Sequence, residues 1–271
     1  MRYPPNDISP VASSEAHELY LHARAPVISY HHQPRSGEHP NAILYLCRDR
    51  GYDLSKLSAN NRSKVRRGLK RLVVRQATPA EAARMGYTCY ADTRVRHHLT
   101  PISRGEFETQ WNRDVDREPF REIWAAFANG EIAALGFVHL CGHWVEIAST
   151  WSANAHLHAY PNHALFYTML YELMHRADIE SVSYGLSSVQ ARGRVDSLHH
   201  FKVSVNLEPV LVTRQIKVNP MLRPGVNAFT RASVRLLERR FPNSSLLRTA
   251  QGALELMSRD ESTSRATSGR S

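Results

Sequence analysis

An Asn-Gly pair between two apolar segments constrains the fold of this chain more than any other feature of its sequence. Residues 123–127 lead into Asn129-Gly130, and the apolar residues 132–140 follow. Both central positions of a type I′ turn need positive φ, which Asn and Gly adopt most easily. Cys141-Gly142-His143 reverses the chain again into residues 144–151. The sequence therefore predicts a three-stranded antiparallel meander.

The segments around the meander alternate between strand-like and helix-like patterns. Short apolar runs predict strands, and apolar residues spaced three and four apart predict helices. Thr78, Pro79 and Glu81 form a capping box at the start of one helix, and Gly185 ends one strand. The predicted strands cover residues 42–47, 73–74, 179–184 and 210–216, and the predicted helices cover residues 57–72, 78–96, 106–111, 161–177 and a segment around Phe201.

Length and composition indicate a globular protein with one large domain, or one and a half smaller ones. The chain has 271 residues, of which 42% are hydrophobic and 22% charged, so it can bury a sizeable core. No stretch approaches the roughly eighteen apolar residues that span a bilayer. The first residues, MRYPPNDISP, lack the apolar stretch of a secretory signal. We therefore expect a cytoplasmic protein.

The cysteines and histidines do not predict a metal site. Cys47, Cys89 and Cys141 are widely spaced and form no C-x-x-C pair, so neither a disulfide framework nor a structural zinc site is indicated. Adjacent histidines such as His31-His32 point to opposite faces of a strand, or about 100° apart on a helix, so such a pair does not chelate a metal ion. We expect no metal.

A formal net charge of +10 favours an anionic partner. Basic residues crowd the predicted helix over residues 57–72, and Arg231, Arg235 and Arg239 recur at helical spacing in residues 227–241. A cationic helix face is commonly only solvated, and contact with RNA or a membrane surface is the alternative. No motif that reads a nucleic-acid sequence is present, so we expect no sequence-specific DNA binding.

The order of the predicted elements resembles the GNAT acyltransferase fold. Helix, hairpin, third strand, long helix, strand, helix and strand follow one another over residues 78–220. A strand ending in Gly185, then Phe201-Lys202 and an apolar strand, resembles the corresponding part of the Fem-type peptidyltransferases and related acetyltransferase-like N-acyltransferases. The basic residues 60–67 followed by Val73-Val74 resemble a partial first domain in a tandem arrangement.

This resemblance implies an α/β (α+β) fold with a central mixed sheet, and it divides the chain into parts. We expect residues 16–77 to form a partial N-terminal GNAT-like unit and residues 78–220 to form the acyltransferase domain. Residues 221–257 are expected to form C-terminal helices. Residues 1–15 and 258–271 are polar with little apolar surface, which predicts disorder at both ends.

The resemblance further implies an N-acyltransferase that moves an acetyl, aminoacyl or longer acyl group from an activated donor to an amine. Acetyl-CoA-dependent members of the superfamily carry a Gln/Arg-x-x-Gly-x-Gly/Ala loop before the long helix, where backbone N–H groups cradle the pyrophosphate. Residues 152–160 stand in that place without a glycine, and the partial match in residues 190–193 comes after the next strand. Acyl-CoA, an aminoacyl-tRNA and an acyl carrier protein are therefore all candidate donors.

Acyl transfer to an amine needs a neutral amine, a stabilised oxyanion and a proton for the leaving group. Glu146, an acid in an apolar strand, is a candidate general base, with a solvent-facing carboxylate as the alternative. Tyr160 and Tyr184 are candidate acids, with ordinary core or surface tyrosines as the alternative. In the GNAT fold a splayed strand offers backbone N–H groups to the acyl oxygen, which here implies Ala148, Ser149 and Thr150.

Lys202 is the side chain that the resemblance singles out most. It follows Phe201 as in the family's Phe-Lys pair, whose lysine is associated with donor phosphate or with the developing negative charge. A lysine ammonium is a compact point charge that can serve either purpose, and we expect Phe201 to pack into the core beside it. Without the resemblance, Lys202 reads as an ordinary surface lysine. Asn162, at the start of the long helix, is a candidate donor-binding residue together with Phe201.

The main alternative is a protein that keeps this fold without catalysis. The cationic helices favour a basic RNA- or membrane-surface-binding role. The hairpin followed by the Phe201-Lys202 pair favours an enzyme. Binding of tRNA at increasing salt concentration distinguishes the enzyme from the non-catalytic binding protein, because a purely phosphate-driven contact weakens steeply with salt.

Overall fold

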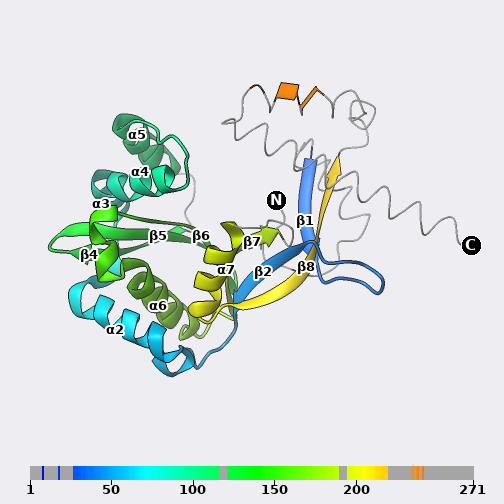
Figure 1. The fold of residues 1–271 in the computed structure, drawn as a ribbon, viewed down its shortest axis with the longest axis horizontal. Helices are drawn as coiled ribbons and strands as arrows, with labels where there is room; N and C mark the ends of the chain where they lie inside the picture. Colours follow the sequence, from blue (N-terminus) through cyan, green and yellow to red (C-terminus); the bar gives the residue numbers. More distant parts are fainter. Residues whose placement is uncertain are drawn as a thin grey trace, which may run out of the picture. The chain divides into compact units, whose positions relative to one another are not determined.

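The computed structural model describes residues 27–115, 121–188 and 194–218, together with Ile8, Glu18 and five positions between 233 and 240. The chain divides into two compact units (Figure 1). Residues 43–210 form the larger unit, and residues 1–42 with 211–271 belong to the smaller one. Apart from the single positions above, segments 1–15, 221–257 and 258–271 lie outside the described residues. What the sequence predicts for them, and for the domain boundaries, stays a prediction.

The larger unit is built on a mixed β-sheet with the strand order β2-β7-β6-β5-β4-β3. Neighbouring strands from β3 to β6 are antiparallel, whereas β6 and β7 run parallel. The predicted α/β class with a mixed sheet is thus confirmed. The strands are β2 (Ala42–Cys47), β3 (Val73–Gln76), β4 (Arg121–Ala128), β5 (Glu131–Cys141), β6 (Trp144–Ser152) and β7 (Ser181–Ser188).

The predicted meander is confirmed, with its first turn at Asn129-Gly130. Both residues have positive φ, 50° for Asn129 and 85° for Gly130, and Ala128 pairs with Glu131 across the turn. This is a two-residue hairpin, and glycine accepts its second position because it has no Cβ. The second turn, between β5 and β6, contains Gly142 with a φ of 63°.

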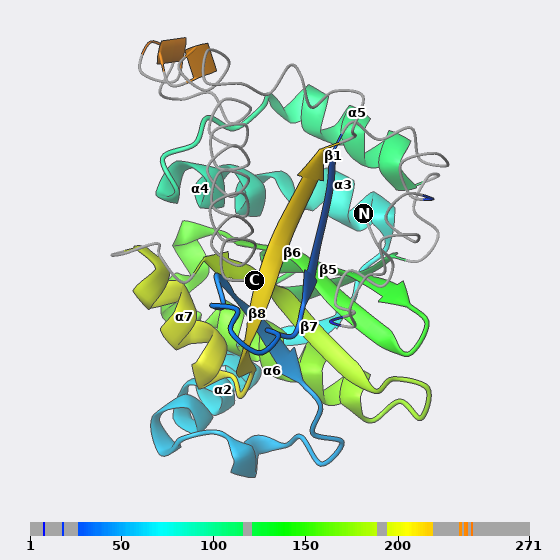
Figure 2. The ribbon, with the colours of Figure 1, turned by 90° about the vertical axis from the view of Figure 1, so that its right-hand side faces the viewer.

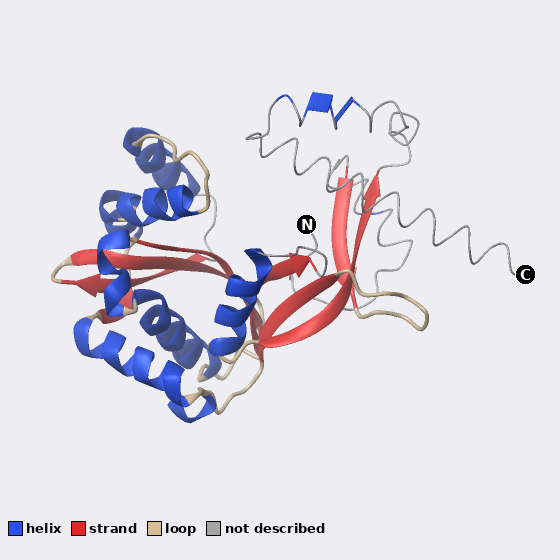
Figure 3. Cartoon of the chain, in the orientation of Figure 1, coloured by secondary structure: helices blue, strands red, loops and turns tan. Residues whose placement is uncertain are grey.

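Helices cover both faces of this sheet, as Figure 3 shows by colour. Figures 1 and 2 place α2 (Ala59–Arg71) and α6 (Pro161–Met174) on one side, and α3 (Pro79–Met85), α4 (Tyr87–Arg96) and α5 (Arg104–Val115) on the other. The α6 side holds one apolar core, and the α3–α5 side holds a second, which is rich in aromatic rings. Because both faces are buried, β4 and β5 are apolar along most of their length.

Helix α2 packs closely against the first turn of α6. A Cβ at Gly68 would lie 2.9 Å from the Cβ of Ala164 and 3.2 Å from the carbonyl oxygen of Tyr160, so this position requires glycine. Val65 and Leu72 are buried, while Leu69 is 38% exposed. Gly68 therefore belongs to the buried face of α2 together with Val65.

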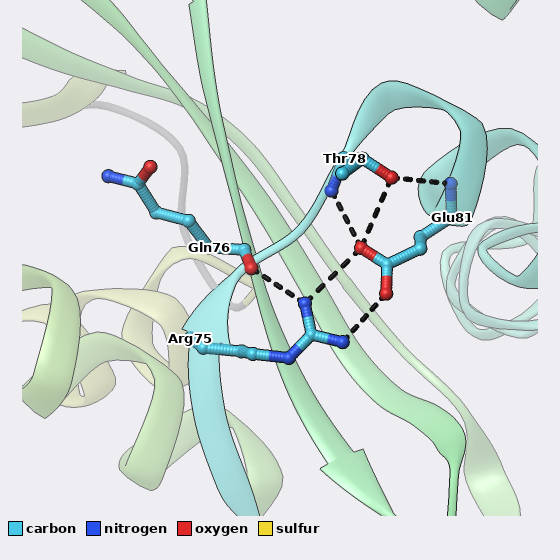
Figure 4. Close-up of polar contacts among 4 residues, drawn as sticks. All are labelled: Arg75, Gln76, Thr78 and Glu81. Carbon is cyan, nitrogen blue, oxygen red and sulfur yellow. Dashed lines mark hydrogen bonds and ion pairs between the residues drawn. The ribbon is translucent and has the colours of Figure 1, made fainter.

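The predicted capping box at the start of α3 is present (Figure 4). Thr78 Oγ1 accepts a hydrogen bond of 3.2 Å from the backbone N–H of Glu81, and the N–H of Thr78 donates to Glu81 Oε2 at 2.8 Å. Arg75 Nη2 lies 2.6 Å from Glu81 Oε1. The hydrogen bond from Arg75, with those from Thr78, lowers the pKa of Glu81 to about 2.

The single helix predicted over residues 78–96 is wrong, because the chain forms α3 and α4 there. The break falls at Gly86, where a Cβ would lie 2.5 Å from the carbonyl oxygen of Ala82 and 2.8 Å from Leu135 Cδ2. This close approach to β5 requires glycine. Helix α5 is longer than predicted, because Ser103 and Glu106 form a second capping box at its start.

Gly185 lies inside β7, so the prediction that the strand ends there is wrong. The residue has a φ of 57°, and the strand continues to Ser188. A glycine within a strand commonly marks a kink or a bulge. Residues 189–193, which include the basic loop with a partial match to the phosphate-binding pattern, lie outside the described residues. Helix α7 (Arg194–Ser204) follows, with Phe201 and Lys202 in its last turns.

In the smaller unit, β1 (Val27–His32) pairs antiparallel with β8 (Glu208–Val218), which begins in the larger unit. Tyr30 donates from its hydroxyl to Gln215 Oε1 at 2.6 Å. The side chain of Asn41 exchanges two hydrogen bonds with the backbone of Arg214. Strand β1 was not predicted from the sequence. No helix in the described part of the chain is both long and apolar enough to cross a bilayer.

Candidate functional site

Strand β6 carries a β-bulge at Ala148. Phe137 of β5 pairs with Ser149 of β6, but its neighbour Val138 pairs with Ile147, so Ala148 has no partner residue on β5. A bulge leaves one residue out of the ladder and bends the strand. Ala148 is also exposed. Of residues 148–150, which the resemblance implies for binding the acyl oxygen, Ala148 is therefore outside the ladder with β5, whereas Ser149 and Thr150 remain paired with it.

The bulge also decides which side chain faces α6. Before it, Val145 and Ile147 belong to the core on the α6 side. After it, Thr150 lies opposite Gly136, and a Cβ at Gly136 would meet Thr150 Cγ2 at 3.2 Å and Leu165 of α6 at 3.4 Å. An extra residue shifts the alternation of side chains by one position. Thr150 therefore faces α6, and Ser149 points to the opposite side.

Strands β6 and β7 pair only at their beginnings. The described ladder runs from Trp144 opposite Ser181 to Glu146 opposite Ser183. Beyond that point, the described side chains of the two strands share one hydrogen bond, between Thr150 Oγ1 and the hydroxyl of Tyr184, at 2.9 Å. Two parallel strands that separate in this way leave backbone groups available to a ligand.

Lys202 is buried beside this point of separation, with only 3% of its surface exposed. Its Nζ lies 4.2 Å from the ring centre of Tyr45 and 4.7 Å from that of Tyr184. Among the described residues, no carboxylate pairs with this ammonium. Burial lowers the pKa of Lys202 to about 8. The reading of Lys202 as an ordinary surface lysine is therefore wrong.

Tyr45, which the sequence analysis did not single out, lies under Lys202. It belongs to β2, is fully buried, and shares a hydrogen bond of 2.8 Å from its hydroxyl with Nδ1 of His199. His199 and Lys202 are three residues apart on α7, so their side chains project from the same face of the helix. One buried tyrosine thus contacts two side chains of α7.

A row of aromatic rings leads from Tyr184 to the start of α6. Phe166 lies 4.9 Å from Tyr184 and 5.0 Å from Phe201, measured between ring centres. His163 lies 5.4 Å from Phe201 and 5.9 Å from Tyr160. Burial, with a smaller contribution from Lys64, lowers the pKa of His163 to about 4, so its imidazole is neutral at physiological pH. This row contains three of the predicted site residues: Tyr160, Tyr184 and Phe201.

Tyr160 has a left-handed backbone, with φ 57° and ψ 45°, directly before Pro161 begins α6. The guanidinium of Arg67 stands 4.5 Å from its ring centre. A non-glycine residue in this region stores strain and is often found at a functional position. Tyr160 therefore lies at the end of the row distant from Lys202, where α2 meets α6.

Asn162 belongs to a polar network at the start of α6. Its Nδ2 donates to Ser152 Oγ at 3.3 Å, and Arg96 Nη2 donates to the same oxygen at 2.8 Å. Arg96 also bonds Asn154 and Thr93. Ser152 is buried. The network ties the end of β6 to α4 and α6.

Glu146 is separated from Lys202 and Tyr184 by the sheet. Its neighbours Val145 and Ile147 face α6, so Glu146 faces the other side, opposite His139 on β5. Burial raises the pKa of Glu146, and His139 partly opposes this rise. A raised carboxylate pKa is a property of general bases. Within the described residues, no cluster of His, Cys, Asp or Glu could hold a metal ion.

Comparison with solved structures identifies FemX, at a TM-score of 0.55 and 11% identity, covering 78% of this chain and 70% of that one. A conserved protein of unknown function from Bacteroides thetaiotaomicron VPI-5482 matches at a TM-score of 0.47 and 13% identity, covering 76% of this chain and 67% of that one. A tandem GNAT protein from the clavulanic acid biosynthesis pathway matches at 0.44 and 11%, covering 76% of this chain and 68% of that one. No protein-family model and no curated protein sequence matches the chain.

At this level of identity the likeness to FemX concerns the fold alone. In this chain the hairpin, the third strand, the long helix α6 and strand β7 follow in the predicted order, and β6 and β7 run parallel. The chain shares the fold of FemX.

Proposed function

We propose that this protein is an N-acyltransferase that moves an acyl group from an activated donor to an amine. The observation that carries the proposal is the ammonium of Lys202, which is buried between the rings of Tyr45 and Tyr184 and has no anionic partner among the described residues. A buried charge without a partner is costly. It becomes favourable when negative charge develops beside it in a transition state.

The bulged segment of β6 supplies the second part of the mechanism. The backbone N–H groups of residues 148–150 are the proposed donors to the acyl oxygen, because Ala148 has left the ladder with β5 and the pairing with β7 ends at Glu146. When the acceptor amine attacks the acyl carbon, the carbonyl oxygen gains negative charge. These N–H groups and Lys202 stabilise that charge. Loss of one such donor costs about 3 kcal/mol of activation free energy.

Tyr184 is the proposed proton donor to the leaving group. A C–N bond forms as the bond between the acyl carbon and the donor's sulfur or oxygen breaks, and the departing thiolate or alkoxide needs a proton. The hydroxyl of Tyr184 lies 2.9 Å from Thr150 Oγ1, and its ring lies beside the ammonium of Lys202. Thr150 then supports the phenolate through their hydrogen bond until a proton from solvent restores the phenol, while the proton lost by the amine leaves by another route.

Glu146 is the proposed base that takes a proton from the acceptor amine. Its raised pKa suits this task. Because it lies on the other face of β6 from Tyr184, the acceptor approaches from that face and the donor from the α6 face. This arrangement keeps the acid and the base on opposite sides of the reacting carbonyl.

The donor side of the site is the start of α6, where Tyr160 and Asn162 lie. Pro161 is the first residue of α6 and has no N–H, and no glycine precedes it within residues 152–160. This supports weak binding of a pyrophosphate there, and it leaves acyl-CoA, an aminoacyl-tRNA and a carrier-bound acyl group as donors to be compared.

A transfer assay with separate donors tests the proposal. Radiolabelled acetyl-CoA, aminoacyl-tRNA and acyl carrier protein are each incubated with the protein and a mixture of small amines, and the labelled amides are measured. Lys202→Met serves as the inactive comparison, and Arg84→Gln, which changes an exposed basic residue of α3, serves as the charge-matched control. Equal product from the Lys202→Met variant and the parent with every donor rejects the role of Lys202.

A non-catalytic polyanion-binding protein is the second candidate, and helix α2 favours it. The helix carries six basic residues and no acidic one: Arg62, Lys64, Arg66, Arg67, Lys70 and Arg71. Their described hydrogen bonds go to carbonyl oxygens, such as that from Arg71 to His158. The buried Val65 leaves no wide apolar face for insertion into a membrane. Steeply salt-dependent binding of tRNA without any transfer product is the result that favours this candidate.

A further inference from the structure

Tyr45 contacts helix α7 at two points, although β2 and α7 are far apart in the sequence. The face of its ring lies 4.2 Å from the ammonium of Lys202. Its hydroxyl shares a 2.8 Å hydrogen bond with His199, three residues before the lysine. The two rings of Tyr45 and His199 are 5.8 Å apart at an angle of 60°.

We propose that Tyr45, held by His199, is the positioning residue for Lys202. This inference rests on the proposed function for its consequence in catalysis, but its structural part stands without it. The ring of Tyr45 holds the ammonium through a cation–π contact, and the hydroxyl fixes the turn of α7 from which the lysine projects.

The groups around the ammonium of Lys202 support a positioning role for Tyr45. A lysine side chain has a flexible four-carbon stem and loses much rotamer freedom when it is fixed. Here no carboxylate among the described residues restrains it, and the recorded contacts of Nζ are two aromatic rings. One of these rings, Tyr184, shares its hydroxyl with Thr150 at the place where β6 and β7 separate. Tyr45 is the contact that does not belong to the separating strands.

The burial of Tyr45 gives its hydrogen bond to His199 an energetic role. The residue is fully buried, and a buried phenol without a hydrogen-bond partner is unfavourable. His199 provides that partner. The pair therefore stabilises the orientation of the ring, and a ring of fixed orientation presents one face to Lys202. The titratable groups around the lysine are Tyr45 on β2, Tyr184 on β7, His199 on α7 and, through Phe201, His163 on α6.

Competitive acylation of amines with trace acetic anhydride across a pH series measures the titration of Lys202 without any enzymatic turnover. Peptide mass spectrometry reports the labelling of Lys202 against other lysines of the same sample. Tyr45→Leu removes the ring and the hydroxyl, whereas Tyr45→Phe and His199→Ala remove only the hydrogen bond. Tyr87→Leu and Tyr87→Phe are matched controls, because Tyr87 donates its hydroxyl to the carbonyl of Ile102 on the other side of the sheet.

In Tyr45→Leu, the midpoint of Lys202 labelling is expected to fall by about one pH unit, a tenfold change in the protonation equilibrium. Tyr45→Phe and His199→Ala are expected to leave this midpoint near that of the parent and to lower kcat severalfold with little change in KM. The double variant Tyr45→Phe/His199→Ala is expected to lose no more kcat than either single variant. The Tyr87 variants are expected to leave the labelling of Lys202 unchanged.

An unchanged midpoint in Tyr45→Leu overturns the proposal. If that variant does not fold, additive losses of kcat in Tyr45→Phe and His199→Ala overturn it instead, since the two residues then act separately. A shifted midpoint in Tyr45→Leu together with full transfer by Lys202→Met supports the positioning of the lysine and rejects the proposed function. The two failures are therefore distinguishable.

Discussion

Thr150 Oγ1 and the hydroxyl of Tyr184 lie 2.9 Å apart, beyond the last paired residues of β6 and β7. A ligand chain that enters between these strands meets this hydrogen bond, whose net contribution to stability is about 1 kcal/mol. The ring of the same tyrosine lies beside the ammonium of Lys202, so this contact joins the separated strands to the lysine.

Lys202→Met is expected to make the protein more stable and less active. The folded pKa of Lys202, about 8, lies below the ordinary lysine value of 10.5. The unfolded state therefore binds more protons between these values, and the ammonium costs the folded state about 1–3 kcal/mol at neutral pH. Methionine fills the same space without this cost. Thermal unfolding is expected to show a higher Tm, and turnover is expected to fall by one or more orders of magnitude.

A variant that loses activity together with stability contradicts this prediction. The pH dependence gives a further check. The parent is expected to gain stability as the pH rises from about 8 towards 10.5, because the lysine loses its proton there in the folded state first. Lys202→Met should lack that gain.

Gly130→Val is expected to destabilise the protein through backbone strain alone. Gly130 has a φ of 85°, but nothing lies within 4 Å of a Cβ built on it. The cost is therefore that of a β-branched residue at positive φ, roughly 1–3 kcal/mol. Gly130→Asn is the matched comparison, because asparagine tolerates positive φ. Urea unfolding of the two variants compares their stabilities. Equal unfolding midpoints would contradict a turn with positive φ at position 130.

Gly68→Ala is expected to push α2 away from α6. The new Cβ would meet Ala164 Cβ at 2.9 Å and the carbonyl oxygen of Tyr160 at 3.2 Å. Overpacking of this kind costs about 1–3 kcal/mol. Ala164→Gly removes the nearest contact, so the double variant should recover part of the loss, and a double-mutant cycle in urea measures the coupling. Additive effects would show that the two helices do not meet at these residues.

His163→Phe is expected to reduce the loss of stability in mild acid. The folded pKa of His163 is about 4, below its ordinary value of 6.5. Between these values the unfolded state binds more protons, so the stability of the parent falls as the pH drops through this range, by roughly 1–3 kcal/mol. Phenylalanine keeps an aromatic ring in the row and does not titrate. Unfolding curves at several acidic pH values compare the two proteins, and parallel losses exclude His163 as the cause.

Acetyl-CoA is expected to bind weakly. Backbone N–H groups at a helix start normally hold a pyrophosphate, but Pro161 has none, the N–H of Tyr160 bonds Leu157, and that of Ala164 bonds Tyr160. Titration calorimetry measures the affinity directly. A submicromolar Kd would overturn the prediction and would favour acyl-CoA as the donor.

The parts of the fold that follow from local chemistry could be predicted from the sequence. The hairpin turn depends only on the adjacent residues Asn129 and Gly130. The start of α3 depends only on the four-residue segment from Thr78 to Glu81. The break at Gly86 could not be predicted, because its cause is Leu135 on a strand that follows much later. A glycine in a helical pattern does not reveal which distant side chain it approaches.

Some residues of the candidate site could be predicted from the sequence, but the contacts between distant residues could not. Lys202 came from a family resemblance and Tyr184 from the need for an acid, and the structure brings the two together. Tyr45 and His199 are 154 positions apart, and no local pattern connects a tyrosine in one apolar strand with a histidine in a polar helix. The separation of Glu146 from Tyr184 depends on which face of the sheet α6 covers, so it too required the structure.

The bulge at Ala148 makes the length of β6 as important as its composition. Removing this one residue would restore the regular ladder with β5, with Ile147 opposite Val138 and Ser149 opposite Phe137. The side chains after it would keep their faces, but the backbone proposed to hold the acyl oxygen would lose the bend that a bulge gives a strand. Descendants of this chain can exchange residues in β6 one at a time, but loss of the Ala148 codon would turn the candidate site into ordinary sheet.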